Sequence, residues 1–592
     1  MAREGRYAPL VVTLESAGRK VDVEVRVDVW RGSELRGTLS RQRFSKALLL
    51  AGGTSRRVPF VIPIAFNPRS IDVRVFSGGQ EIARREIDLR PAVTGDRLVV
   101  GISSELSLDF LSSLSGAGGN VRVVYPHVEN LPESWAGYDG IELVVVRDTS
   151  FQRLRTAQVE ALERWVVSGG TLVFSGGAAA LQYASAGFGN LLPVEVTGLR
   201  ERDGLPSLAA FLREAERPRG RVTLAASRAA GGTVLVSDDG MPVLVQRRLG
   251  QGTVWFTAFD STLPPFDSWR GTLSLWRLLA ENGREPLLGA VFRSPRDDPW
   301  MKTLLDAPSM SFPSRFSLLG LSGLYLLLLA PLAAGRLARG PRGRVRAVLL
   351  AAAPVLACVA AFLLFNGALF PPGARLLDAA KVEVVPGSGF ARVTQEIGFF
   401  ATRAGSYDVS IGSVDAVLGE IGPALATPAR EGPDFTIDTR DGTVLRGVAL
   451  SPFQARLFAL SAVVEQPLEA ALAVEGQAVS VSIVNRSARA LRGCFLARGG
   501  IAYPIGDLGP GEKRSLTFAP ADGIDLRDPP SRVRLLGGAQ RASFWDREYG
   551  VLGKGKTLAA AWLDGPAIPV RRDAGPGLVE LPALSLVVME VP

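Results

Sequence analysis

The chain is poor in the two residue types that most often build metal sites and covalent cross-links. Its 592 residues include two cysteines and one histidine. Cys358 lies within an apolar run and Cys494 lies far downstream in a strand-rich region, so we expect neither an intrachain disulfide nor a cysteine-based metal site. His127 alone cannot supply the usual ligand set of a zinc site. The sequence therefore predicts no metal and no cofactor.

Basic runs interleaved with aromatic residues are also missing, although the formal net charge is +9. The arginines are spread along the chain, which is typical of solvated surface charges, and nucleic acid is not expected as a partner. Hydrophobic residues make up 47% of the chain. That share is high for a purely soluble protein of this length and indicates membrane-spanning segments.

Two uncharged runs, residues 316–335 and 347–370, are each long enough to cross a hydrocarbon core of about 30 Å. We expect both to be transmembrane helices. The loop between them, residues 336–346, has no acidic residue and carries the arginines Arg336, Arg339, Arg342, Arg344 and Arg346. The positive-inside rule places this loop in the cytoplasm and both large flanking regions outside, and the same arginines could bind anionic lipid headgroups. The reverse orientation, with a cytoplasmic amino-terminal region, stays open as an alternative.

The first residues, MAREGRYAPLVVTLES, contain no charged-then-apolar export signal. Because an exported amino-terminal region needs such a segment, we expect a signal peptide or a further helix upstream of Met1. The expected location is the bacterial cytoplasmic (inner) membrane, as a multi-pass protein with its large domains extracytoplasmic. The expected partners are the lipid bilayer and another envelope or membrane protein.

Changes in hydrophobic period divide the rest of the chain. Residues 1–93 contain alternating strands such as VDVEVRVDV and are expected to form an immunoglobulin-like β-sandwich. Residues 94–285 alternate between apolar strands and helical patterns, and residues 286–315 are expected to be a juxtamembrane linker. Residues 371–592 are strand-rich, with a Gly-Pro-Gly turn, and predict one or two further β-sandwich domains.

The pattern in residues 94–285 predicts an α/β domain. Apolar strands are expected at residues 98–102, 121–124, 141–146 and 171–174. A helix is expected over residues 151–167, capped by Thr149 or Ser150, and a closing helix over residues 269–280. Alternation of strand and helix favours a mostly parallel, doubly wound sheet.

The segment GYDGIELVVVRDTSFQRLRTAQVEALERWVVSGGTLVFSGG, residues 137–177, resembles the glutamine-amidotransferase-like domain of bacterial envelope proteins. In that group a Tyr-Asp pair and an apolar strand precede a helix ending in tryptophan, a Gly-Gly turn and another strand. The resemblance implies a flavodoxin-like α/β fold. The cysteine of class I amidotransferases is absent, because no cysteine lies between residues 95 and 285 and Val173-Phe-Ser-Gly-Gly stands at the elbow. We therefore expect a degenerate domain without amidotransferase chemistry.

A serine hydrolase is the catalytic alternative. His127, Asp148 and Ser175 each follow a predicted strand, so all three could lie at the carboxyl edge of a parallel sheet as base, orienting carboxylate and nucleophile. The structural alternatives are that Ser175 serves a turn, Asp148 starts a helix and His127 is an exposed loop residue. Asp260 could line a ligand cleft with Asp148 and Ser175, or cap the loop that follows it.

These observations favour a membrane-anchored cell-envelope binding or scaffold protein whose amidotransferase-like domain is not catalytic. Two alternatives stay open: a serine hydrolase using Ser175, His127 and Asp148, and an accessory subunit of an envelope transport complex.

Overall fold

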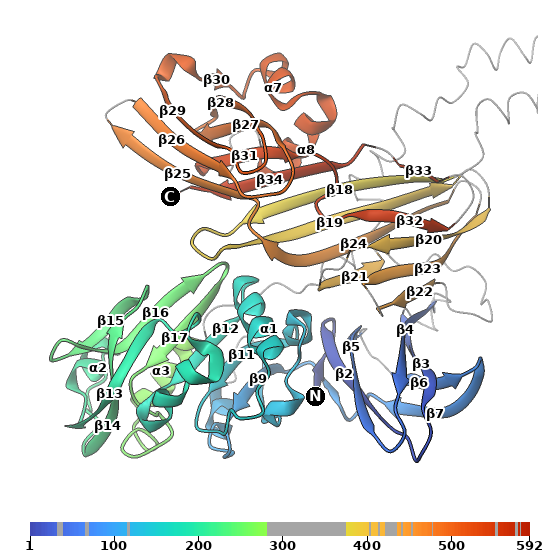
Figure 1. The fold of residues 1–592 in the computed structure, drawn as a ribbon. Helices are drawn as coiled ribbons and strands as arrows, with labels where there is room; N and C mark the ends of the chain where they lie inside the picture. The colour runs from blue at the N-terminus through green and yellow to red at the C-terminus, as the bar shows by residue number, and fades with distance from the viewer. Residues whose placement is uncertain are drawn as a thin grey trace, which may run out of the picture.

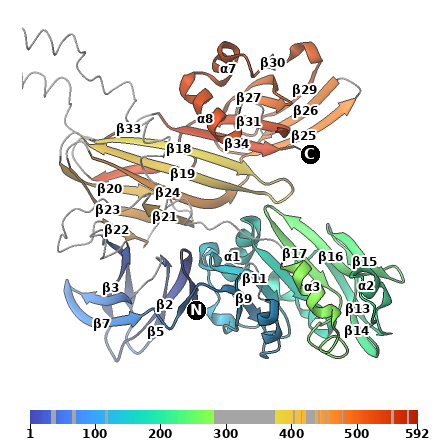
Figure 2. The same ribbon diagram turned by 180° about the vertical axis from the view of Figure 1, so that it is seen from behind.

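The computed structural model describes residues 1–31, 40–64, 70–114, 119–280, 374–401, 404–412, 415–420, 435–439, 442–451, 454–475, 478–550, 555–574, 578–580 and 582–591. Strands dominate these residues. Figure 1 shows the amino-terminal strands and an α/β region side by side, with the carboxyl-terminal strands lying over both. The same arrangement is seen from behind in Figure 2.

The α/β region is built on a seven-stranded sheet with the strand order β10-β9-β11-β12-β17-β16-β15. Its strands are β9 (Arg97–Ile102), β10 (Val121–Val124), β11 (Ile141–Val146), β12 (Thr171–Ser175), β15 (Thr233–Asp238), β16 (Met241–Leu249) and β17 (Gly252–Thr257). The first five strands in this order run parallel, whereas β16 and β15 are antiparallel. Strands β12 and β17 are buried along their whole length, which explains their continuous apolar sequences.

Three α-helices and one strand pair complete the described part of this region. Helix α1 (Thr156–Val167) joins β11 to β12, and α3 (Gly271–Leu279) follows β17. The chain between β12 and β15 adds the antiparallel pair of β13 (Val194–Asp203) and β14 (Arg221–Ala229), with the short helix α2 (Pro206–Phe211) between them.

The expected flavodoxin-like, doubly wound domain is wrong. In the described part of the chain, the connections from β9 to β10 and from β10 to β11 contain 3-10 turns instead of α-helices. These turns are η2 (Asp109–Leu114), η3 (Val128–Asn130) and η4 (Trp135–Tyr138). The apolar runs predict the strands correctly, but the connecting segments are rich in Ser, Gly and Pro and do not form the helices that both faces of such a fold require.

Helix α1 is also shorter than expected at its amino end. It begins at Thr156, with Arg155 at the N-cap, so neither Thr149 nor Ser150 caps it. The Gln158 side chain accepts a hydrogen bond from the Arg155 amide (2.9 Å) and satisfies a donor that the first turn leaves free.

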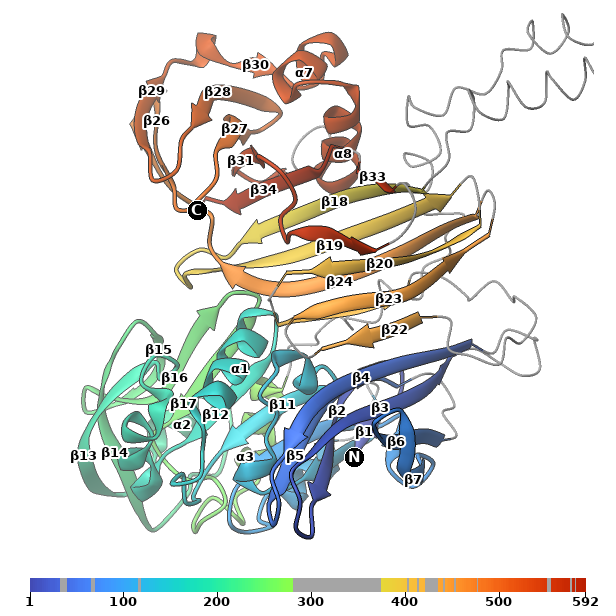
Figure 3. The ribbon, with the colours of Figure 1, turned by 45° about the vertical axis from the view of Figure 1, so that its right-hand side comes forward.

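The amino-terminal strands share a sheet with carboxyl-terminal strands. The order of this eight-stranded sheet is β32-β20-β23-β22-β4-β3-β6-β7. Its amino-terminal members are β3 (Val21–Arg31), β4 (Ser40–Leu50), β6 (Ser70–Ser77) and β7 (Gln80–Asp88). Its carboxyl-terminal members are β20 (Gly405–Ile411), β22 (Phe435–Asp438), β23 (Thr443–Leu450) and β32 (Val570–Ala574). The two groups join where β4 pairs in parallel with β22, visible where the dark blue β4 meets the orange strands in Figure 3.

The expected self-contained immunoglobulin-like sandwich is therefore also corrected. Strands β2 (Tyr7–Glu15) and β5 (Ser55–Pro63) form a separate two-stranded sheet. Its buried residues, such as Phe60, belong to one hydrophobic core with carboxyl-terminal residues such as Phe399 and Phe458. Alternation in the sequence identifies which face of a strand is buried, but it does not identify the neighbouring strand in the sheet. The sheet and core that the amino-terminal strands share with the carboxyl-terminal strands could therefore not be predicted from residues 1–93 alone.

The largest sheet belongs to the carboxyl-terminal half and has the order β21-β24-β19-β18-β34-β31-β27-β28-β30. Its strands are β18 (Ala374–Val384), β19 (Phe390–Ala401), β21 (Ala416–Glu420), β24 (Gln454–Glu465), β27 (Leu491–Arg498), β28 (Ile501–Leu508), β30 (Ile524–Asp525), β31 (Leu558–Leu563) and β34 (Leu584–Glu590), and β33 (Leu578–Glu580) pairs with β18. Strands β25 (Leu468–Glu475), β26 (Ala478–Asn485) and β29 (Lys513–Phe518) form a further small sheet. Helices α7 (Pro529–Leu536) and α8 (Ala539–Tyr549) share a core with Trp562 of β31 and were not expected in a β-sandwich.

The assignment to a membrane is corrected as well. Within the residues described, no helix combines the length and the apolar character that a membrane span requires. The two expected transmembrane segments, residues 316–335 and 347–370, and the arginine loop between them lie outside the described residues. The structure thus gives no support to a multi-pass inner-membrane protein.

Candidate functional site

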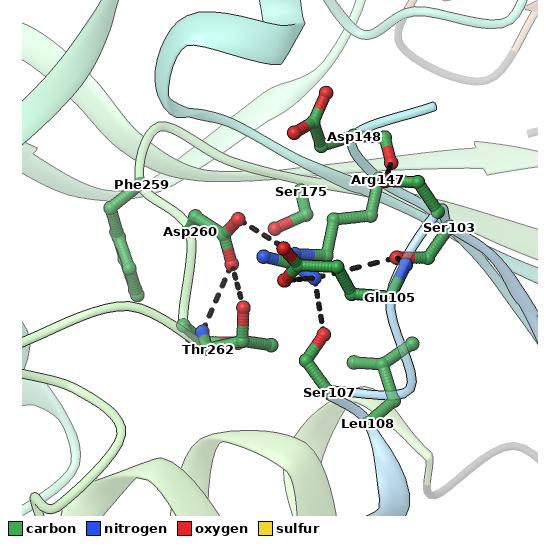
Figure 4. A network of polar contacts seen from close by, with 12 residues as sticks. Ser103, Glu105, Ser107, Leu108, Arg147, Asp148, Ser175, Phe259, Asp260 and Thr262 are labelled. Carbon is green, nitrogen blue, oxygen red and sulfur yellow. Dashed lines mark hydrogen bonds and ion pairs between the residues drawn. The ribbon is translucent and has the colours of Figure 1, made fainter. Parts of the chain in front are cut away.

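The parallel strands bring several polar residues to one edge of the seven-stranded sheet. Strands β9, β11, β12 and β17 are neighbours and point the same way, so the residues after their carboxyl ends gather together. These residues include Ser103 after β9, Arg147 and Asp148 after β11, Ser175 at the end of β12, and Asp260 after β17, as Figure 4 shows.

A buried ion pair lies at the centre of this edge. The Arg147 Nε atom donates to Asp260 Oδ2 at 2.7 Å, and the two side chains are 3% and 8% exposed. Arg147 also donates to the hydroxyl groups of Ser107 and, at 3.4 Å, Ser103. The second carboxylate oxygen, Asp260 Oδ1, accepts from the Thr262 amide at 2.9 Å and the Thr262 hydroxyl at 2.8 Å. Both charges are thus paired and further hydrogen-bonded, which a buried ion pair requires to be stable.

Ser175 lies beneath this ion pair. Strand β12 runs between β11 and β17, so a side chain that reaches from the end of β11 to the residues after β17 must cross the end of β12. Figure 4 shows Ser175 beside the Arg147 side chain. Ser175 is 2% exposed, and within the described residues its hydroxyl has no hydrogen-bond partner. The position expected for a nucleophile is therefore closed to solvent.

Tyr183 holds the ends of the two central strands together. Its hydroxyl donates to the backbone oxygen of Ser175 and lies 3.2 Å from that of Val146. Burial raises the pKa of the Tyr183 phenol well above its ordinary value, and the charges of Asp260 and Asp148 act in the same direction. The phenol stays protonated and serves as a donor to the strand ends.

The other two members of the expected triad lie elsewhere. Asp148 is exposed, and its backbone oxygen accepts from the amide and the hydroxyl of Ser104, both at 2.9 Å. It does not start a helix, because α1 begins at Thr156. His127 is exposed after β10, which β9 and β11 separate from β12. Three strand spacings of about 4.8 Å each place β10 roughly 14 Å from β12.

The segment that follows His127 is held against α1 and not against the strand ends. The Gln158 amide nitrogen, on α1, donates to the backbone oxygens of Val128 (3.0 Å) and Leu131 (2.8 Å). Among the described residues no hydrogen bond joins His127 to Asp148 or Ser175. The structure thus brings Ser175 and Asp260 together, leaves Asp148 at the rim, and does not assemble the triad.

The Gly-Gly turns on both sides of β12 have packing reasons. A Cβ on Gly170 would lie 2.4 Å from the indole of Trp165, and one on Gly176 would lie 2.2 Å from the backbone oxygen of Thr257. Gly169 and Gly177 have positive φ angles of 114° and 70°, which favour glycine. The motif therefore serves close contact of α1 and β17 with β12.

Arg147, the central residue of this edge, was not among the residues expected from the sequence. The available signal was its place directly after the apolar run Val144-Val-Val, because a charge at the end of a buried strand needs a partner. No group of three or more metal-ligating side chains occurs in the described residues.

Comparisons with protein families give two matches, both to domains whose function is unknown. A family model described as a domain of unknown function (DUF8726) matches residues 1–90, and a second domain of unknown function (DUF7408) matches residues 120–268. Neither covers half of the chain. The first match spans β2 to β7, and the second runs from β10 past the end of β17. No curated protein matches.

Solved structures show weak similarity. Cytoplasmic Protein STM3548 from Salmonella typhimurium is 17% identical with a TM-score of 0.27, over 32% of this chain and 100% of that chain. A beta-galactosidase from Bacillus circulans sp. alkalophilus is 12% identical with a TM-score of 0.19, over 62% of this chain and 41% of that chain. Similarity at this level does not establish a shared fold.

Proposed function

We propose that this protein is a binding or scaffold protein and that its seven-stranded sheet is a structural unit without catalytic activity. The observation that supports the proposal is the Arg147–Asp260 ion pair across the carboxyl edge of the sheet. In an open α/β sheet this edge is where a substrate would bind. Here the ion pair and its serine and threonine partners occupy it and satisfy one another.

Ser175 also lacks the surroundings that a nucleophilic serine requires. A nucleophilic serine needs a base within about 3.2 Å and access to the substrate carbonyl. Ser175 is 2% exposed, and the single histidine of the chain lies at another strand end. This arrangement favours binding over hydrolysis.

Labelling with a fluorophosphonate tests the proposal, because this reagent forms a covalent bond with activated serines. The full chain and the Ser175→Ala variant are expected to remain equally unlabelled. The free energy of unfolding of Ser175→Ala is expected to lie within about 0.5 kcal/mol of that of the parent chain or slightly above it, because the lost hydroxyl has no hydrogen-bond partner in the described residues. Labelling of the parent chain that disappears in Ser175→Ala would contradict the proposal.

A further inference from the structure

A cavity lies where the amino-terminal strands, the α/β region and the carboxyl-terminal strands meet. Its volume is about 370 Å³. The lining comes from β2, β4 and β5, from residues between 129 and 136 together with Arg155, and from residues in and beside β21, β22 and β23. A cavity of this size can hold a small organic molecule. It is separate from the ion-paired edge of the seven-stranded sheet, because neither Arg147 nor Asp260 lines it.

One wall of the cavity is apolar. In the β2–β5 sheet, Pro9 lies opposite Val61, and Val11 lies opposite Pro59. These four side chains share one face, while Phe60 and its neighbours on the other face are buried. Val11 is 38% exposed. Val61 also packs against the core of the α/β region, so this face is partly covered by that region and partly lines the cavity, where its side chains offer an apolar surface to a ligand.

The cavity also contains cationic side chains without carboxylate partners. Lys46 follows Phe44 by two residues on β4 and so lies on the same, inward face of the strand, where Phe44 is 5% exposed. Among the described residues, no carboxylate lies within ion-pair distance of Lys46 or Arg57. The Arg57 guanidinium instead donates to neutral oxygens, the backbone oxygen of Glu129 at 3.1 Å and the amide oxygen of Asn130 at 2.6 Å.

The acidic residues of the lining already have partners. Glu133 pairs with Arg155 at 2.8 Å, and Glu129 pairs with Arg153. Asp415 accepts a hydrogen bond from the Ser134 hydroxyl at 2.8 Å, and burial raises the pKa of this carboxyl. Burial lowers the pKa of Lys46, with Glu133 acting in the opposite direction and Arg56 in the same direction as burial, because the ammonium loses hydration and no carboxylate of the described residues lies within ion-pair distance. Among the described residues of the lining, the groups outside ion pairs are thus two cations, Lys46 and Arg57, and one carboxyl, that of Asp415, so positive charge is in excess among these unpaired groups.

We propose that this cavity binds a small organic anion with an apolar body, its charged group against Lys46 and Arg57 and its apolar part against Pro9, Val11, Pro59 and Val61. The inference names the ligand class for the binding function proposed above and rests on that function. Charge complementarity selects an anion, and the apolar wall selects a ligand with a hydrocarbon or aromatic portion.

The test uses the full chain and two fluorescent probes that differ in charge. Anilinonaphthalene sulfonate carries one sulfonate on an apolar body, and N-phenyl-1-naphthylamine is its uncharged counterpart. The sulfonate probe is expected to bind more tightly, and octanoate is expected to displace it. The Lys46→Met variant is expected to weaken binding of the sulfonate probe about tenfold or more and to leave the neutral probe unchanged. Val11→Ser is expected to weaken both.

Lys20→Met is the matched control, because Lys20 is exposed and lies outside the cavity. It is expected to leave both affinities unchanged. Thermal unfolding of each variant shows whether the fold is intact, and Lys46→Met is not expected to destabilise it, since it removes a partly desolvated charge. Equal affinities in Lys46→Met and the parent chain would overturn the proposal. If the affinities are equal and the parent chain is also not labelled by the fluorophosphonate, the ligand class proposed here is wrong but the proposed non-catalytic function is not contradicted.

Discussion

Arg147 combines near-complete burial with a permanent charge, so its partners decide whether the seven-stranded sheet is stable. The guanidinium is 3% exposed and reaches Asp260, 113 residues later in the chain. Removing one charge of a buried pair leaves the other desolvated without compensation, whereas removing both leaves no such charge.

Asp260→Ala is therefore expected to lower the free energy of unfolding by about 3–5 kcal/mol. The double variant Arg147→Met/Asp260→Leu is expected to lose less than the single variant, since both charges are gone. Chemical denaturation followed by tryptophan fluorescence measures both. Arg153→Met is the control, because its pair with Glu129 is exposed and screened by solvent, so its loss is expected to change the free energy of unfolding far less than Asp260→Ala does. A double variant less stable than Asp260→Ala would contradict this account.

Asp378, on β18, is a buried carboxyl whose titration has a measurable consequence. Its Oδ2 atom accepts from the Gln395 side chain at 2.9 Å, and burial raises its pKa to about 7. A carboxyl whose pKa is higher in the folded state than in the unfolded state stabilises the fold below the unfolded pKa. That contribution is lost as the pH rises from about 4 through about 7.

The Asp378→Asn variant is expected to lack this dependence. The difference in unfolding free energy between the parent chain and the variant should shift by up to about 4 kcal/mol between pH 4 and pH 8, in favour of the variant at the higher pH. Urea unfolding at several pH values measures it, and comparing the two chains removes the titration of other carboxylates. Parallel pH profiles would show that Asp378 is ionised in the folded protein.

At the scale of single elements, the turn after β12 requires glycine at position 176, because the backbone after β17 leaves no room for a Cβ there. Gly176→Ala would place a Cβ 2.2 Å from the backbone oxygen of Thr257, so β12 or β17 would have to shift. We expect a loss of at least about 2 kcal/mol of unfolding free energy. Gly189→Ala is the matched control, since its φ is −51° and nothing lies within 4 Å of its added Cβ. Equal melting temperatures for the two variants would contradict the packing argument.

Local patterns predicted most elements of the α/β region. The strands around Val99, Val123, Val144 and Val173 lie where their apolar runs indicated, because such runs reflect burial of the strand itself. Helices α7 and α8 were missed although local signals exist. Asp528 caps α7 by accepting from the Ser531 amide, and Gly537 ends it with a φ of 77°.

What the sequence could not provide were the partners of these elements. The pairing of Arg147 with Asp260 and the cover over Ser175 follow from strand order, and periodicity does not encode strand order. The surplus charge around Lys46 likewise arises from segments far apart in the chain.

For the whole molecule, the parallel pairing of β4 with β22 joins the two halves of the chain, which also share one hydrophobic core. Co-expressed fragments of residues 1–280 and 374–592 are therefore expected to elute together in size-exclusion chromatography. Ile437→Pro, on β22 opposite Phe44, removes a backbone donor and is expected to separate them.

Val474→Pro is the control for this experiment, because Val474 lies on β25, an edge strand of the small three-stranded sheet. It is expected to leave the fragments together. Separate elution of fragments with the unaltered sequence would show that the shared sheet does not hold the halves together.

The same β4–β22 pair has a consequence during synthesis on the ribosome. Gln42 of β4 pairs with Phe435 of β22, which is synthesised almost four hundred residues later. At 5–20 residues per second, the edge of β4 stays without its partner for roughly 20–80 s. An open strand edge is a template for pairing with other chains, so the nascent protein needs protection of β4 over that interval.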